Sequence, residues 1–259
     1  MKKDTLQVQI IQSSLVWEDA EANFESFEKH LVELGPGDLV LLPEMFPTGF
    51  TMNPERLADG QGRVLVWMKE MANRFQKALC GSVAVREAGQ HFNRLYFVQP
   101  DGVSYKYDKR HLFTMGDEPN HYSAGKDRIV IEYLGWKILP LVCYDLRFPV
   151  YSRNDIGYDM LLYVANWPAK RAHHWKSLLM ARAIENQSYL AACNRVGDDG
   201  NAVAHSGDSC LINYKGDILA SLSEEEGYLS AEFSYDELVE ARTKFPVLPD
   251  ADSFSAEWK

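Results

Sequence analysis

Hydrophobic and polar positions along the chain follow two patterns, one with the spacing of strands and one with the spacing of helices. Residues 6–12 (LQVQIIQ) alternate as a strand, whereas residues 18–34 repeat apolar side chains at helical intervals until the stop at Gly35-Pro36-Gly37. Further strands are predicted near residues 38–44, 78–86, 92–99, 103–107, 128–133, 136–143, 159–164, 189–194, 208–213, 217–222 and 227–232. Further helices are predicted near residues 62–76, after Phe148-Pro149, over 171–187 and after Ser234.

Several of the predicted strands are apolar on both faces. The stretches LVLLP at 39–43 and MLLYVAN at 160–166 offer little that would face water, which is typical of a sheet covered on both sides. Helices alternate with single strands in some regions, and hairpins such as the one at Asp101-Gly102 intervene in others. The pattern predicts a layered α/β fold with more than one sheet, in which functional residues gather at the carboxyl ends of strands.

Composition and charge narrow the class of protein. With 259 residues, 46% of them hydrophobic, the chain can bury a sizeable core. Its formal charge of −10 argues against nucleic acid and acidic membrane surfaces as partners. No run of about 18 apolar residues indicates a membrane span, and Asp4, Gln7 and Gln9 interrupt any signal-peptide core. We therefore expect a cytoplasmic protein whose partner is neither nucleic acid nor a membrane.

The cysteines and histidines indicate neither a disulfide framework nor a metal site. The cysteines are widely spaced without a CxxC pair, so we expect four reduced thiols, Cys80, Cys143, Cys193 and Cys210. The adjacent His173 and His174 cannot both point to one face of a helix, and no HExxH motif is present. These two histidines are interpreted as packing or solvent-exposed residues, and no metal is predicted.

Cys143 stands where the apolar run of LPLVCYDLRF stops and charged residues begin. A free cysteine usually behaves as a small buried hydrophobe, and the other three cysteines, inside strand-like segments, keep that interpretation. At Cys143 the strand end also resembles a nucleophile elbow, which aims the side chain outward. A helix starting after Phe148-Pro149 would place its positive N-terminus nearby and lower the pKa of this thiol.

A nucleophilic cysteine needs a base and a group that stabilises an oxyanion. None of the seven histidines has an obvious partner context, but Glu44 follows Leu41-Leu42-Pro43 at a strand end, and Lys109 lies in the extended segment YKYDKRHLF. Taken singly, Glu44 reads as a solvated acid or a helix cap, and Lys109 as a surface lysine. Only their combination with Cys143 indicates a catalytic site.

Three separate motifs resemble the nitrilase superfamily of carbon–nitrogen hydrolases. Glu44 in LLPEMF, Lys109 in YDKRHLF and Cys143 in LVCYDLRFP match the Glu-Lys-Cys triad of that superfamily in order and in local context. Residues 166–197 and 205–220 fit the same superfamily, so the resemblance spans nearly the whole chain. It is closest to the ω-amidase branch.

The resemblance implies a single four-layer αββα domain over residues 1–259 that dimerises across one helical layer and needs neither a metal nor an organic cofactor. It makes Cys143 the nucleophile that forms a thioester, and Glu44 the general base. Lys109 and the backbone N–H of Tyr144 would stabilise the oxyanion. Glu118, which otherwise reads as an exposed loop acid, would orient Lys109 and the substrate nitrogen.

For the substrate, the resemblance implies terminal amides of short 2-oxo dicarboxylic acids, such as 2-oxoglutaramate and 2-oxosuccinamate. These are anions and the protein is acidic, so a local cation must bind their carboxylate, and the candidates are Arg147, Lys170 and Arg171. A salt bridge with Asp145 or another acid explains Arg147 equally well. Trp167 is explained equally well as a pocket wall and as a core residue. Aliphatic amidase, N-carbamoylase, nitrilase and a non-catalytic scaffold are the alternative functions.

Overall fold

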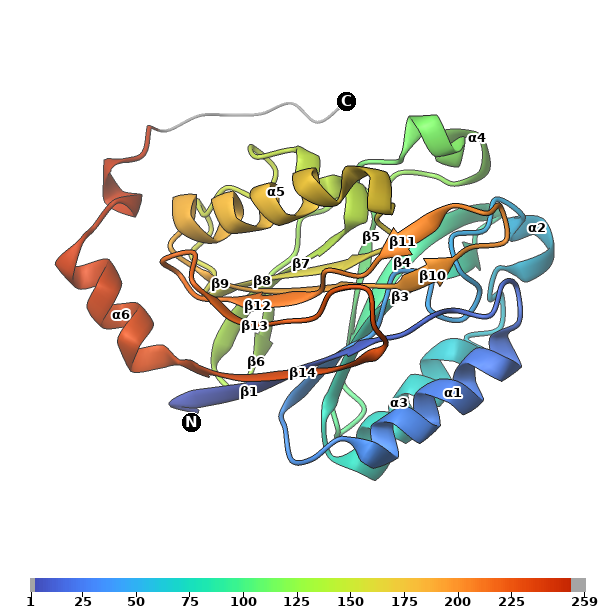
Figure 1. Cartoon of the computed structure of the whole chain (residues 1–259), viewed down its shortest axis with the longest axis horizontal. Helices are drawn as coiled ribbons and strands as arrows, with labels where there is room; N and C mark the ends of the chain where they lie inside the picture. Colours follow the sequence, from blue (N-terminus) through green and yellow to red (C-terminus); the bar gives the residue numbers. More distant parts are fainter. Residues whose placement is uncertain (1–2, 253–259) are drawn as a thin grey trace.

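The computed structural model of the protein describes residues 3–252 as two six-stranded sheets that face each other between layers of helices (Figure 1). The first sheet runs in the order β14 (Gly227–Ser234), β1 (Thr5–Gln12), β2 (Leu39–Leu41), β3 (Ala78–Glu87), β4 (Gln90–Val98) and β5 (Ser104–Asp108). The second sheet runs in the order β13 (Ile218–Ser221), β12 (Cys210–Ile212), β9 (Tyr189–Asn194), β8 (Met160–Ala165), β7 (Trp136–Val142) and β6 (Ile131–Tyr133). The predicted four-layer αββα fold is confirmed.

Both sheets are mixed. Strands β1, β2 and β3 are parallel neighbours in the first sheet, and β7, β8 and β9 are parallel neighbours in the second. Each parallel group is flanked by antiparallel strands on both sides. Strand β14 returns from the far end of the described chain to pair with β1, from Thr5 opposite Ser234 to Gln12 opposite Gly227. A late segment of the sequence thereby completes the first sheet.

Helices cover the outer faces of the two sheets (Figure 1). Helices α1 (Ala20–Glu33) and α3 (Arg63–Phe75) lie against the first sheet, and α5 (Ala172–Glu185) lies against the second. The Asp19 side chain accepts the backbone N–H of Ala22 and caps α1. The other elements are α2 (Pro54–Leu57), α4 (Glu118–His121), α6 (Tyr235–Lys244), the hairpin of β10 (Val196–Asp198) and β11 (Ala204–Ser206), and the 3₁₀ turns Thr114–Gly116, Cys143–Arg147, Ala169–Arg171 and Leu248–Asp250.

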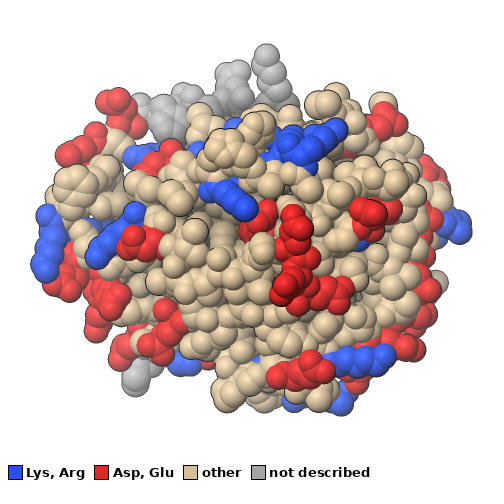
Figure 2. Space-filling model, viewed as in Figure 1, with Lys and Arg blue, Asp and Glu red and all other residues tan. Residues whose placement is uncertain are grey.

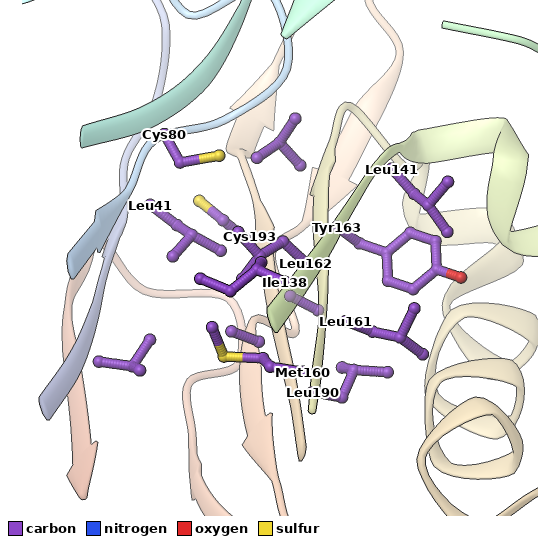
Figure 3. Packing of buried hydrophobic residues seen from close by; sticks show 14 of the residues in the cluster. Leu41, Cys80, Ile138, Leu141, Met160, Leu161, Leu162, Tyr163, Leu190 and Cys193 are labelled. Carbon is purple, nitrogen blue, oxygen red and sulfur yellow. The ribbon is translucent and has the colours of Figure 1, made fainter. Parts of the chain in front are cut away.

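The apolar run of β8 is buried on both sides because a sheet covers one face and a helix the other. Figure 3 shows Leu162 on the side of Leu41 and Cys80 of the first sheet, whereas Leu161 and Tyr163 lie on the side of α5. All five side chains are fully buried. Successive residues of a strand point to opposite faces, so continuous apolar sequence is what this central position requires.

One predicted helix is absent. The residues after Phe148-Pro149 form turns, and helical geometry occurs instead in the 3₁₀ turn Cys143–Arg147 just before them. In this segment the Asn154 side chain accepts the Tyr158 N–H and donates to the carbonyl oxygens of Tyr158 and Asn186. Such side-chain bonds to the backbone compete with the hydrogen bonds of a helix. The sequence patterns also did not predict α2, α4 or the β10–β11 hairpin.

Acidic side chains are exposed in many places on the surface. Figure 2 shows Asp and Glu spread over the face in view, with Lys and Arg between them, as the formal charge of −10 requires. Within residues 3–252, no helix combines the length and the apolar character needed to cross a membrane.

Candidate active site

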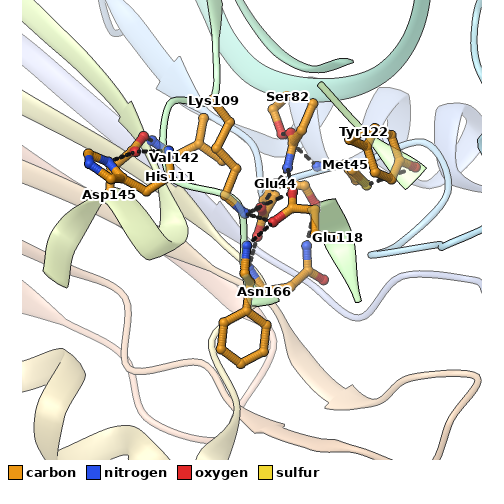
Figure 4. Close-up of polar contacts among 12 residues, drawn as sticks. Glu44, Met45, Ser82, Lys109, His111, Glu118, Tyr122, Val142, Asp145 and Asn166 are labelled. Carbon is orange, nitrogen blue, oxygen red and sulfur yellow. Dashed lines mark hydrogen bonds and ion pairs between the residues drawn. The ribbon is translucent and has the colours of Figure 1, made fainter. Parts of the chain in front are cut away.

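Four functional side chains meet at the carboxyl ends of strands from both sheets. Glu44 lies after β2 and Lys109 directly follows β5 in the first sheet, while Cys143 directly follows β7 and Asn166 directly follows β8 in the second. All four line one cavity, and Figure 4 shows Glu44, Lys109 and Asn166 turned toward one another. The structure therefore brings together Glu44, Lys109 and Cys143, the three residues that the sequence nominated.

Lys109 is a buried cation held between two carboxylates. Its Nζ donates to Glu44 Oε1 at 2.8 Å and to Glu118 Oε2 and Oε1 at 2.9 and 3.1 Å, and all three side chains have an exposed fraction of 0%. Burial alone would lower the pKa of Lys109, but Glu118 and Glu44 outweigh it and raise this pKa above its ordinary value. Lys109 is thus no surface lysine, and Glu118 is no exposed loop acid.

Glu118 opens the short helix α4, and its Oε2 also accepts the Phe113 N–H at 2.6 Å. Burial raises the pKa of Glu118 above its ordinary value; Lys109 opposes this rise and the neighbouring Glu44 adds to it. Two carboxylates around one ammonium would leave an excess negative charge in a dry site. Both oxygens of Glu118 accept N–H donors, from Lys109, Asn93 and the Phe113 backbone, so this carboxylate fixes the position of the Lys109 ammonium.

Two asparagines to which the sequence analysis gave no role fix the orientation of Glu44. Asn93 of β4 donates from Nδ2 to Glu44 Oε1 at 2.8 Å and to Glu118 Oε1 at 3.1 Å. Asn166 donates its backbone N–H to Glu44 Oε2 at 2.8 Å and its Nδ2 to the Glu44 carbonyl oxygen at 2.6 Å. Each carboxylate oxygen of Glu44 therefore has a donor. The sequence signal was weak, because Asn93 stands next to Arg94 and before the apolar run LYFV of β4.

Cys143 has a left-handed backbone conformation with φ of +44°, which is uncommon for a residue other than glycine and occurs where the surroundings enforce it. Burial raises the pKa of its thiol well above the ordinary value; Glu44 adds to this rise through its charge and a hydrogen bond, and Lys109 opposes it. The thiol is thus protonated at neutral pH, so the lowered pKa expected from a helix after Phe148-Pro149 is wrong. Activation of the thiol requires a base.

Asp145 braces the turn that follows Cys143. Its carboxylate is fully buried and accepts the backbone N–H groups of Val142 and His111 at 3.0 and 2.9 Å and the Tyr107 hydroxyl at 2.7 Å (Figure 4). These donors come from the end of β7 and from the segment that carries Lys109. Asp145 therefore couples the nucleophile's turn to the first sheet and does not form the salt bridge with Arg147 that the sequence allowed.

A cavity of about 460 Å³ extends outward from these groups and has three cations in its wall, Arg147, Lys170 and Arg171. Within residues 3–252, none of the three forms an ion pair with a carboxylate. The Arg147 guanidinium lies 4.8 Å from the centroid of the Trp167 ring. Trp167 lines the cavity and also packs on Trp175 at 5.4 Å, so it is both wall and core. The remaining lining residues are Phe50, Met52, Phe113, Met115, Gly116, Tyr144, Pro168, Asp199, Asn201, Val203 and His205.

This arrangement is suited to nucleophilic chemistry at a carbonyl. A protonated thiol, a carboxylate beside it and a buried ammonium supply nucleophile, base and charge stabilisation in one place. Within residues 3–252, no group of three or more His, Cys, Asp or Glu side chains is placed to hold a metal ion.

Comparison with known proteins identifies the family. The family model described as carbon-nitrogen hydrolase matches residues 6–243. The chain belongs to the carbon–nitrogen hydrolase family. One relative is "Omega-amidase YafV" of Yersinia enterocolitica, which is 48% identical over 251 residues, 96% of this chain and 98% of the relative. Another is "2-oxoglutaramate amidase" of Bacillus subtilis, 39% identical over 89% of each chain.

A solved carbon–nitrogen hydrolase has nearly the same fold. The crystal structure of XC1258 from Xanthomonas campestris, described as carrying an arsenic adduct in its active site, superposes with a TM-score of 0.96 at 42% identity. The match covers 98% of this chain and 100% of that one. The four-layer arrangement of this carbon–nitrogen hydrolase is therefore the arrangement of its family.

Iodoacetamide is expected to modify Cys143 in the folded protein and to spare the other three cysteines. Cys143 lines the cavity, whereas Cys80, Cys193 and Cys210 are buried in β3, β9 and β12. Since the pKa of the Cys143 thiol is raised, its labelling needs Glu44 as proton acceptor, and Glu44→Gln should slow it. Peptide mass spectrometry after brief treatment at neutral pH measures both effects. Preferential modification of Cys193 would contradict the assignment of the accessible thiol.

Proposed function

We propose that this carbon–nitrogen hydrolase is an ω-amidase, which releases ammonia from the terminal amide of short 2-oxo dicarboxylic acid monoamides through a thioester on Cys143. The observation that carries the proposal is the buried Glu44, which reaches both the Cys143 thiol and Lys109. The names of the two relatives, an ω-amidase and a 2-oxoglutaramate amidase, support this substrate class.

In the first half of the reaction, Glu44 takes the proton of the Cys143 thiol as the sulfur attacks the amide carbon. The carbonyl oxygen becomes an oxyanion, which Lys109 and the backbone N–H of Tyr144 stabilise. Glu44 then returns the proton to the nitrogen as the C–N bond breaks, so ammonia leaves and the acyl group stays on sulfur. Glu118 holds Lys109 in place through two hydrogen bonds, and its orientation of the substrate nitrogen stays a prediction.

In the second half, Glu44 accepts a proton from water, and the resulting hydroxide adds to the thioester carbon. Lys109 again stabilises the oxyanion. Collapse of this intermediate breaks the C–S bond, and the proton on Glu44 passes to the departing sulfur. The products are the dicarboxylic 2-oxo acid and the original thiol, so Glu44 ends each cycle ionised.

The far carboxylate of the substrate is proposed to bind the cations Arg147, Lys170 and Arg171. Burial and the charge of Arg171 lower the pKa of Arg147 below its ordinary value, so an arginine without an acid partner lies beside another cation in the cavity wall. An anionic ligand would relieve this repulsion. A guanidinium also grips a carboxylate through two parallel hydrogen bonds.

Arg147→Met is expected to raise KM for 2-oxoglutaramate by at least about tenfold, because a charge-assisted hydrogen bond contributes roughly 1.5–3 kcal/mol. KM for a neutral short amide should stay near the wild-type value. Arg63→Met is the matched control, since Arg63 lies exposed on α3 and pairs with Glu21, so it changes net charge without touching the cavity. Equal increases in KM for both substrates in Arg147→Met would contradict carboxylate recognition by this residue.

The direct test of the proposed function is ammonia release by the wild-type protein from 2-oxoglutaramate and 2-oxosuccinamate, compared with aliphatic amides, nitriles and N-carbamoyl compounds. Preference for the 2-oxo acid amides is the expected result. Preference for one of the other classes would overturn the ω-amidase assignment in favour of another hydrolase of this family, and inactivity on all of them would favour a non-catalytic scaffold.

Three further features stay predictions that accompany this function: a single catalytic domain over residues 1–259, a homodimer and a cytoplasmic location. Size-exclusion chromatography of the purified protein tests the homodimer, and elution of the activity with the dimeric fraction would support it.

A further inference from the structure

His174 forms a hydrogen bond that the proposed reaction does not explain. It lies in the first turn of α5, and its Nδ1 is 2.9 Å from Nη2 of Arg147. An arginine side chain has donors and no acceptor, so His174 Nδ1 must accept and carries no proton. The side chain that meets the pocket arginine is therefore a neutral imidazole.

A neutral acceptor affects Arg147 differently from an acid. A carboxylate partner would neutralise the guanidinium and compete with an anionic substrate for its N–H groups. His174 occupies one of the five N–H donors of Arg147, leaves the full positive charge in place and leaves the other four donors available. The guanidinium is thereby held on two sides, by His174 Nδ1 and by the face of the Trp167 ring at 4.8 Å.

The backbone around His174 is itself fixed. The next residue, Trp175, is fully buried and donates its indole N–H to the Asp208 carbonyl oxygen at 2.8 Å. Trp167 donates its indole N–H to the carbonyl oxygen of Arg171 at 2.9 Å, just before α5 begins. The exposed His174 side chain thus projects from an anchored helical turn.

We propose that His174 is a positioning residue that orients the Arg147 guanidinium toward the carboxylate of the substrate without neutralising it. The inference rests on the proposed function and adds to it a residue that contributes to substrate specificity without contacting the reacting atoms.

His174→Phe keeps a flat ring and removes the acceptor. We expect it to raise KM for 2-oxoglutaramate by about three- to tenfold, the range that one hydrogen bond of ordinary net strength gives, with kcat and the KM for a neutral short amide unchanged. His174→Asn should restore a low KM, because its Oδ1 lies close to the position of Nδ1. His173→Phe is the matched control, since His173 is the adjacent exposed histidine of α5 and the Arg147 hydrogen bond goes to His174, and it should behave as the wild type.

The double variant Arg147→Met with His174→Phe separates positioning from other effects of the histidine. If His174 acts through Arg147, its replacement should change nothing further once Arg147 is gone. An additional loss in the double variant, or equal changes for anionic and neutral amides in His174→Phe, would overturn the role of His174 alone. Absence of ammonia release from 2-oxoglutaramate by the wild type would overturn the proposed function, and the role of His174 with it.

Discussion

Replacing the nucleophile, as in Cys143→Ala, is expected to abolish ammonia release from every amide substrate and to leave the melting temperature nearly unchanged. Without sulfur the thioester cannot form, and within residues 3–252 no other thiol and no serine or threonine hydroxyl lines the cavity. The side chain is small, so its truncation leaves little empty volume. Removing the thiol also removes its hydrogen bond to Glu44, but the other donors to that carboxylate stay.

Initial rates with 2-oxoglutaramate and a thermal melt followed by circular dichroism measure the two effects of Cys143→Ala. Cys210→Ala is the matched control, because Cys210 is a buried thiol of β12 outside the cavity, and it should retain full activity once folded. Measurable steady-state turnover in Cys143→Ala would show that the reaction does not pass through a thioester on this residue.

Loss of the base, as in Glu44→Gln, is expected to lower kcat by about 10²–10⁴-fold, the usual contribution of a general acid–base group. Glutamine has nearly the same shape and can still accept the backbone N–H of Asn166, but it cannot take the proton of a thiol whose pKa is raised. The amide nitrogen of the glutamine would take the place of Glu44 Oε1. There it would face two donors, Lys109 Nζ and Asn93 Nδ2.

Glu55→Gln is the control for Glu44→Gln, since Glu55 is an exposed residue in the first turn of α2. Single-turnover measurements separate acylation from hydrolysis of the thioester, and both steps should slow because Glu44 serves in each. Retention of more than about a tenth of kcat would exclude Glu44 as the essential base, given the magnitude such groups contribute.

The layered fold was predictable because a strand that is buried on both faces has a continuous apolar sequence. The run around Leu161, Leu162 and Tyr163 has no polar position, and the structure buries it between a sheet and a helix. The triad was predictable because the motifs around Glu44, Lys109 and Cys143 resemble those of a known superfamily. Position alone read Glu44 as a solvated acid or a helix cap and Lys109 as a surface lysine, and the structure shows that all three line one cavity.

The failures concern hydrogen bonds of polar side chains, some of them between segments far apart in sequence. Asn93 looks like an ordinary polar strand residue until β4 places it beside Glu44 and Glu118. Asp145 could pair with Arg147 on spacing alone, but its partners are the backbone of β7 and the segment near Lys109. The helix expected after Phe148-Pro149 was wrong because the side chain of Asn154 bonds to the backbone. Hydrophobic periodicity does not indicate any of these hydrogen-bond partners.

The division of the site between two sheets has a consequence for how the protein acquires activity as it folds. The base and the ammonium come from one sheet and the nucleophile from the other, so a chain with either sheet formed alone contains no working site. The first sheet is also incomplete until β14, the last strand along the sequence, pairs with β1. Recovery of turnover during refolding therefore reports the docking of the sheets, and a partly synthesised chain cannot consume substrate before that step.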